Sequence, residues 1–531
     1  MRTPTSIPTL TALAAAGALV LVGCSEPDDE PGPDGTRDID ARAYYDDYET
    51  QADDLALAMP ESASADDGGG GPVPIPGPTE DNTFVDAGTS GFVDPRQDPL
   101  STFALDVDTG SYGVARSLLE QGYRPPPASV RVEEWVNAME YDDPAPTDAD
   151  LGVVAESSSA PGVTSRLEAD TQLVRVGVSA REVQPSERAR VNVTLVVDRS
   201  GSMDIRDRLG LVQSSLALLA DRLAGDDTVS VVSFEDQARP ILEPTPVRDT
   251  GEILDAIEEL KPGGSTNLEA GLRLGYEQAR EGFDADAVNL VVLASDGVAN
   301  VGATGPGSIT EKIAEEGRDG IHLVTVGYGM GNYNDHLMEQ LADLGDGFYS
   351  YVDTYGEAEQ LFGTDLTTTL TPVAAEARTQ VAFDPELVTS YRLVGYDNRE
   401  IADDDFDDLS VDAGELGAGH HATALYEVRL ADGVAPGTPI GEATVKWEGV
   451  SDGRGHVADT ELVAADPEAT PSHSLALAST VADLAQVLKD AAWYRDRDVD
   501  LPDIGERAKA LGADEIVDLV RLAEESRLYI G

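Results

Sequence analysis

Residues 191–203 read Val-Asn-Val-Thr-Leu-Val-Val-Asp-Arg-Ser-Gly-Ser-Met, an apolar, β-branched run followed by polar side chains. The apolar part has the composition of a strand that is buried on both faces of a parallel sheet. The polar part places a carboxylate and two hydroxyls at alternate positions, Asp198, Ser200 and Ser202. Ligands of open α/β sheets collect at the carboxyl ends of strands, and Mg²⁺ prefers oxygen ligands. The stretch therefore favours a metal site, although the triplet alone also fits a plain helix N-cap.

Two later stretches supply the same chemistry. Residues 263–267 read Gly-Gly-Ser-Thr-Asn before an amphipathic helix, and residues 288–297 form a second apolar strand that ends in a carboxylate. Five residues together resemble the metal-ion-dependent adhesion site of von Willebrand factor type A (VWA) domains: Asp198, Ser200, Ser202, Thr266 and Asp296. The resemblance implies a bound Mg²⁺, with Mn²⁺ or Ca²⁺ as alternatives. It also implies that the ion captures a carboxylate from a protein partner.

The first 24 residues resemble the signal peptide of a bacterial lipoprotein. Met1 and Arg2 precede an apolar stretch over 10–22, which is too short to span a bilayer, and Leu-Val-Gly comes directly before Cys24. Cys24 is the only cysteine, so a disulfide within the chain is excluded. We expect Cys24 to be lipidated and the protein to be held at a membrane of the cell envelope, facing outside the cytoplasm. An ordinary cleaved signal peptide is the alternative.

Acidic residues dominate the composition. The chain has 36 basic and 100 acidic residues, with a net charge of −64. Such a surface repels nucleic acid, so we expect no nucleic-acid partner. Residues 25–96 are also rich in Pro, Gly and Ser, and this composition predicts a disordered, flexible tether between the lipid and the folded part.

Residues 186–372 alternate near-continuous apolar strands with helices. This pattern predicts an α/β fold with a doubly wound, mostly parallel sheet of the VWA or Rossmann-like type. A strand over 239–247 is expected at the edge of the sheet, because Pro244 and Pro246 interrupt it.

The remaining parts of the chain are expected to flank this domain. Residues 97–185 are the N-terminal VWA-associated segment, with two helices and a strand at 173–179. In several stretches of residues 373–531, apolar and polar residues alternate at period two, which predicts the strands of an antiparallel β-sandwich. This part of the chain closes with two C-terminal helices, which are expected at 472–494 and 504–525.

The strand at 173–179 precedes the VWA domain, whereas the other period-two strands follow it. The simplest packing joins this early strand to the strands at 379–383 and 421–430. The VWA domain is then inserted into one split sandwich.

Three other motifs contain residue types that occur in known sites. Asp108-Thr-Gly-Ser and Asp249-Thr-Gly resemble the paired loops of aspartic proteases, but no apolar strand precedes the second one. The acidic run over 403–408 lacks the glycine and glutamate of an EF-hand, which favours a solvated loop. His420 and His421 have no partner at zinc spacing, so we expect a structural role.

The flanks resemble those of a family of bacterial VWA lipoproteins. The similar stretches begin at Ser101, Val130, Tyr391 and Val411. The sequence contains no Gly-x-Ser-x-Gly motif and no P-loop, and no His or Cys base lies near the metal motif, so we expect no enzymatic activity. We expect a lipoprotein that binds a protein partner through its metal site. The alternatives are a metal-dependent accessory subunit of an envelope enzyme complex and a purely architectural domain.

Overall fold

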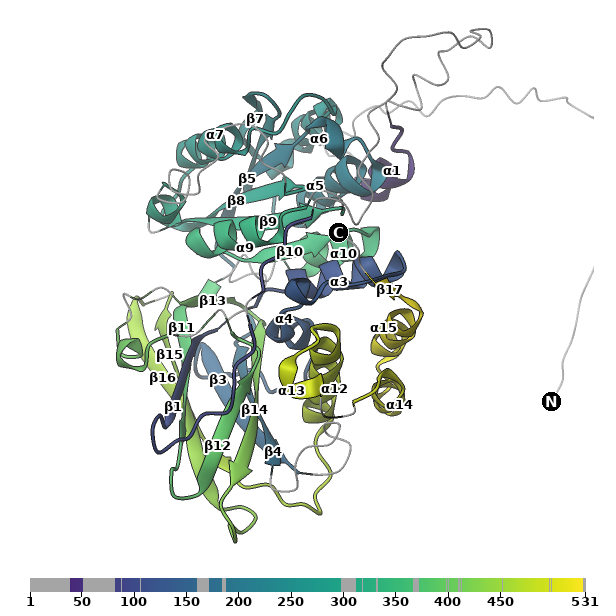
Figure 1. Cartoon of the computed structure of the whole chain (residues 1–531). Helices are drawn as coiled ribbons and strands as arrows, with labels where there is room; N and C mark the ends of the chain where they lie inside the picture. The colour runs from purple at the N-terminus through teal and green to yellow at the C-terminus, as the bar shows by residue number, and fades with distance from the viewer. Residues whose placement is uncertain are drawn as a thin grey trace, which may run out of the picture.

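The structure is a computed structural model. It describes residues 39–50, 82–86, 88–105, 107–159, 171–183, 188–297, 312–317, 319–330, 333–365, 372–397, 399, 401–408, 411, 413–450, 452–495, 497 and 499–528. An α/β domain lies at one end, a β-sandwich lies at the other, and a layer of helices packs beside the sandwich (Figure 1).

The α/β domain is built on a six-stranded sheet, and the predicted fold class is confirmed. The strand order is β10-β9-β8-β5-β6-β7. The strands are β5 (Arg190–Asp198), β6 (Thr228–Phe234), β7 (Ala238–Pro246), β8 (Ala287–Ser295), β9 (Ile321–Tyr328) and β10 (Tyr349–Val352). All neighbours are parallel except β7, which pairs antiparallel with β6 at the edge, as its prolines predict. The central position of β5 and β8 places both predicted carboxylates in the middle of one sheet edge.

Helices cover both faces of this sheet. One face packs against α5 (Leu211–Arg222), α6 (Thr250–Glu259) and α10 (Tyr355–Gln360). The other face packs against α7 (Leu268–Glu281) and α9 (Asp335–Leu344), together with α3 (Gly110–Glu120) from the N-terminal segment. The short π-helix η3 (Arg206–Gly210) leads into α5. Because apolar side chains of β5 reach both clusters, the strand is buried on both sides, as its composition predicts.

The sandwich consists of two antiparallel sheets with an apolar core between them. One sheet contains β1 (Leu100–Ala104), β11 (Pro372–Phe383), β13 (Gly414–Gly417), β15 (Pro439–Gly449) and β16 (Arg454–Val463). The other has the order β12 (Val388–Val394), β14 (His421–Leu430), β4 (Thr171–Ala180) and β3 (Leu151–Ser158). Strand β4 pairs with β14 over its length and faces β11 across the core. The predicted split sandwich is therefore confirmed, because strands from before and after the α/β domain share both sheets.

The helical layer differs from the prediction. The expected helix over 472–494 is two helices, α12 (His473–Leu488) and α13 (Ala492–Arg495). The expected helix over 504–525 is also two, α14 (Leu501–Leu511) and α15 (Asp514–Glu525), because Gly512 adopts a left-handed conformation (φ 72°) that ends α14. Helices α12, α14 and α15 share a core with α3 and α4 (Val132–Asn137).

The prediction of a disordered tether over 25–96 is wrong for two stretches. Helix α1 (Ala41–Asp46) packs on α5, and the Tyr45 hydroxyl donates a hydrogen bond to Asp207 at 2.8 Å. Farther along, Val93 pairs with the free edge of β12. The tyrosines of the first stretch supply apolar surface for docking, which the average acidic composition conceals.

The predicted signal peptide, including Cys24, lies outside the described residues. In the part of the chain that the structure describes, no helix is both long and apolar enough to cross a membrane.

Candidate metal site

The structure brings the predicted carboxylates together at the carboxyl ends of two adjacent strands. Asp198 is the last residue of β5, and Asp296 directly follows β8. The two strands run parallel and in register, with Val197 opposite Ala294. Both aspartates are fully buried. Two acidic groups therefore share one water-poor place, which is an unfavourable arrangement unless positive charge compensates it.

The hydroxyls lie on the two loops next to these strands. Ser200 donates its backbone N–H to Asp198 Oδ1 at 2.8 Å, and its Oγ lies 3.0 Å from the Oγ of Ser202. The second loop is tied to the first, because Gly201 donates its N–H to the carbonyl of Gly264 at 3.1 Å. Thr266 follows in that second loop and is buried. All five predicted residues thus come from three segments that meet at one edge of the sheet.

Glycine is required where the loops meet. Gly264 has φ 77°, and a Cβ there would lie 2.8 Å from Glu235 Oε2. Arg199, at the variable position of the motif, forms an ion pair with the same Glu235 and donates to the carbonyl of Lys261 at 2.9 Å. These contacts hold the two loops against each other.

Burial, and to a smaller extent the charge of Asp296, raise the pKa of Asp198 to about 7. Three hydrogen bonds oppose the shift and lower this pKa: those of the Ser200 N–H, of the Ser295 hydroxyl, which donates to Asp198 Oδ2 at 2.7 Å, and of the Ser200 hydroxyl. The Arg208 guanidinium lies on the other carboxylate, with Nη1 2.9 Å from Asp296 Oδ2. The local electrostatics thus favour a cation at this edge.

The residues present fit a hard divalent ion. The set contains two carboxylates and three hydroxyls, which are the oxygen donors that Mg²⁺ takes while it keeps several waters. Among the described residues, no three His, Cys, Asp or Glu side chains form a metal-binding group. This absence is consistent with the motif, since three of its five donors are Ser and Thr. In a loaded site, Ser200, Ser202 and Thr266 would bind the ion directly, and the aspartates would bind it directly or through water.

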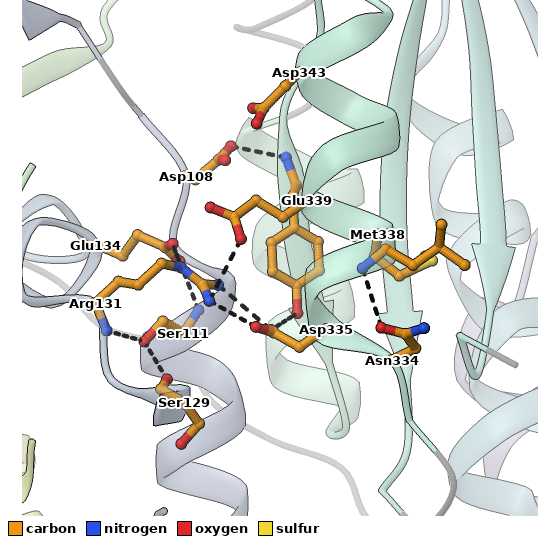
Figure 2. A network of polar contacts seen from close by, with 12 residues as sticks. Asp108, Ser111, Ser129, Arg131, Glu134, Asn334, Asp335, Met338, Glu339 and Asp343 are labelled. Atoms are coloured by element: carbon orange, nitrogen blue, oxygen red, sulfur yellow. Dashed lines mark hydrogen bonds and ion pairs between the residues drawn. The ribbon is translucent and has the colours of Figure 1, made fainter. Parts of the chain in front are cut away.

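The structure also places the two Asp-Thr-Gly loops and the histidine pair. Asp108, which Figure 2 shows beside α9, accepts the N–H of Tyr349 at 2.8 Å. It also pairs with Arg399 at 2.9 Å. Asp249 precedes α6, which covers the face of the sheet opposite to α3, so the two Asp-Thr-Gly loops do not face each other. Burial lowers the pKa of His420 to about 4, and His421 contacts the carbonyl of Met139 at 2.7 Å.

A buried polar network, which no pattern in the sequence predicts, joins the α/β domain to its flanks. Arg131 precedes α4 and binds Glu134 of that helix and Asp335 of α9, with 2.6 Å between Nη1 and Asp335 Oδ2 (Figure 2). The side chains of Arg131, Glu134 and Asp335 are at most 4% exposed. Two adjacent glutamates in a short helix usually indicate a face exposed to solvent, so the local sequence does not predict that Glu134 is buried against Arg131.

Comparison with known proteins identifies three parts of the chain. The model for the von Willebrand factor type A domain matches residues 192–364. A model described as von Willebrand factor matches residues 78–175, and the model for the C-terminal part of the uncharacterized protein YfbK matches residues 368–437. None of these descriptions names an enzyme.

Two relatives are similar over part of their lengths. YfbK of Escherichia coli is 39% identical over 342 residues, which cover 63% of this chain and 59% of YfbK. The uncharacterized protein sll0103 of Synechocystis sp. is 33% identical over 189 residues, which cover 36% of this chain and 44% of that protein. The chain thus spans less than two thirds of either relative.

A solved von Willebrand factor type A structure from Catenulispora acidiphila has a TM-score of 0.43 and 14% identity, and covers 70% of this chain and 89% of that chain. The matched models and the sheet topology agree on the central domain. The chain therefore contains a VWA domain between an N-terminal segment that matches a von Willebrand factor model and a C-terminal segment that matches the C-terminal model of YfbK, and it is similar to YfbK across these parts.

Proposed function

We propose that this protein binds a protein partner through a divalent cation, Mg²⁺, at the edge of its VWA sheet. The observation that carries the proposal is the convergence of Asp198 and Asp296, both fully buried, with three hydroxyls from neighbouring loops. An ion held mainly by neutral hydroxyls keeps a strong attraction for a further anionic ligand. A carboxylate of a partner protein has the charge and the oxygen donor that such an ion takes.

Calorimetric titration of EDTA-treated protein tests the metal site. Asp198→Ala is expected to weaken Mg²⁺ binding by more than roughly 100-fold, and Thr266→Ala by roughly 10-fold to 100-fold, because each removes an oxygen donor. Ser265→Ala is the matched control, since Ser265 is exposed beside Thr266 and its backbone N–H, which donates to Asp236 Oδ1 at 3.2 Å, is kept in the variant. Unchanged affinity in both the Asp198 and the Thr266 variants would reject the assignment.

Affinity capture from envelope extracts then tests the binding function. The wild-type protein is expected to retain a partner in Mg²⁺ and release it in EDTA, whereas Asp198→Ala retains none. Partner retention that is equal in the variant and in EDTA would show that capture does not depend on the ion.

The proposal also includes the membrane anchor at Cys24, which is supported by its position directly after Leu-Val-Gly. Two or more acyl chains give stable membrane retention. The Cys24→Ser variant is therefore expected to move from the membrane fraction to the soluble fraction of the envelope. Membrane retention equal to that of the wild type would contradict lipidation.

A further inference from the structure

Arg208 lies inside the proposed metal site although it belongs to no part of the motif. It comes from the π-helix η3, just after the loop that carries Ser202. Its Nη1 donates to Asp296 Oδ2 at 2.9 Å and to the carbonyl oxygen of Ser202 at 2.7 Å, and its Nη2 donates to the carbonyl of Met330. The Arg208 side chain is 4% exposed and that of Asp296 is 0% exposed. One guanidinium therefore bridges the two halves of the ligand set.

The place of this guanidinium is shaped by the backbone around it. Gly329 has φ 72°, and a Cβ there would lie 2.6 Å from Arg208 Nε. Any side chain at position 329 would collide with the arginine. Gly329, which follows β9, thus leaves the space that the Arg208 side chain fills, and three oxygen acceptors bind its guanidinium.

The charges at the site determine what Arg208 does. With both carboxyl groups ionised, as a bound divalent ion would keep them, Asp198 and Asp296 supply a charge of −2, and Arg208 supplies +1. A divalent ion added to this set leaves an excess of +1, whereas the same ion without the arginine gives a neutral site. At short range in a buried place, one unit of charge has a large effect on ion affinity.

We propose that Arg208 is a resident cation of the metal site, which compensates Asp296 in the absence of metal and lowers the affinity for the divalent ion. The inference rests on the proposed function, because it concerns the same five ligands. The arginine keeps the two carboxyl-end loops assembled without metal, through Asp296 on one side and the Ser202 carbonyl on the other. The price is weaker retention of the ion.

Arg208→Gln and Arg208→Lys in the full chain test the proposal, with thermal unfolding after EDTA treatment and at one fixed Mg²⁺ concentration. The glutamine variant is expected to have a lower melting temperature than the wild type in EDTA, and Mg²⁺ is expected to raise its melting temperature by more than it raises that of the wild type. Its calorimetric Kd for Mg²⁺ is expected to be roughly tenfold lower than that of the wild type. The lysine variant keeps the charge, so its gain from Mg²⁺ is expected to match that of the wild type.

Arg188→Gln is the matched control. Arg188 pairs with the buried Asp227 at 2.6 Å, beside the amino-terminal end of β5 and away from the metal site. A purely structural arginine lowers the melting temperature equally with and without Mg²⁺, and this is the expected behaviour of the control. Asp198→Ala, introduced into the wild type or into Arg208→Gln, is expected to abolish the rise in melting temperature with Mg²⁺.

The outcomes separate the two proposals. If the wild type responds to Mg²⁺ and Arg208→Gln gains no more than it does, the role of Arg208 is overturned while the metal site stands. A lysine variant that behaves like the glutamine variant also overturns it, because charge is then irrelevant. If only Arg208→Gln responds, Arg208 is confirmed as the competing cation and the proposed Mg²⁺ function of the wild type fails. If neither responds, both proposals fail.

Discussion

Arg131→Met is expected to lower the free energy of unfolding by about 3–5 kcal/mol. The substitution removes the guanidinium that pairs with both Glu134 and Asp335, and leaves the two carboxylates buried at the junction of α4 and α9 (Figure 2). A buried charge without its partner costs far more than the same charge in water. Because the pair connects the flanking helices to the VWA domain, the loss is also expected to weaken the docking of the two parts.

Urea denaturation followed by circular dichroism measures this effect. Arg521→Met is the control, because Arg521 is 53% exposed and pairs only at 3.5 Å with exposed Asp518 and Glu525 on α15. Exposed pairs of this kind contribute about 0–1 kcal/mol. A loss in Arg131→Met no greater than that of the control would show that the network does not hold the junction.

At pH 8 the Glu339→Gln variant is expected to be more stable than the wild type, by up to about 3 kcal/mol. The pKa of Glu339 is raised to about 7. Burial is the largest cause; the charge of Arg131 opposes the rise, and the charge of Asp335 adds to it. The contacts of Glu339 with Arg131 (3.6 Å) and Arg399 (3.9 Å) are long, since both arginines have closer acidic partners. The carboxyl group is thus most stable in its neutral form.

The sign of the pH dependence follows from this pKa. In the unfolded chain the group titrates near 4.5, so the folded state holds the proton more tightly. Stability from this group is complete below the unfolded pKa and is lost as the pH rises from about 4.5 through about 7. The wild type is expected to lose stability across this window more steeply than Glu339→Gln. Glu524→Gln, at an exposed position of α15, should leave the slope unchanged, and equal slopes in all three proteins would contradict the prediction.

The sequence by itself determined the architecture around the metal motif. The apolar run of β5 and the alternation of strands and helices specified the α/β sheet, because burial on both faces leaves a continuous apolar pattern. The period-two strands specified the sandwich, and the position of β4 before the VWA domain specified its split. The same pattern predicted that Asp198 and Asp296 lie together, since carboxyl ends of adjacent parallel strands meet at one edge.

Only the tertiary structure decided which charges share a buried place. Arg131 and Asp335 are 204 residues apart, and Arg208 and Asp296 are 88 residues apart, so no local pattern couples them. The docking of α1 was hidden for the same reason, because its tyrosines bury their apolar surface only against α5, which is distant in the sequence. Periodicity records the burial of apolar faces along one element. The pairing of buried charges depends on distant elements, and therefore appears only when the chain is folded.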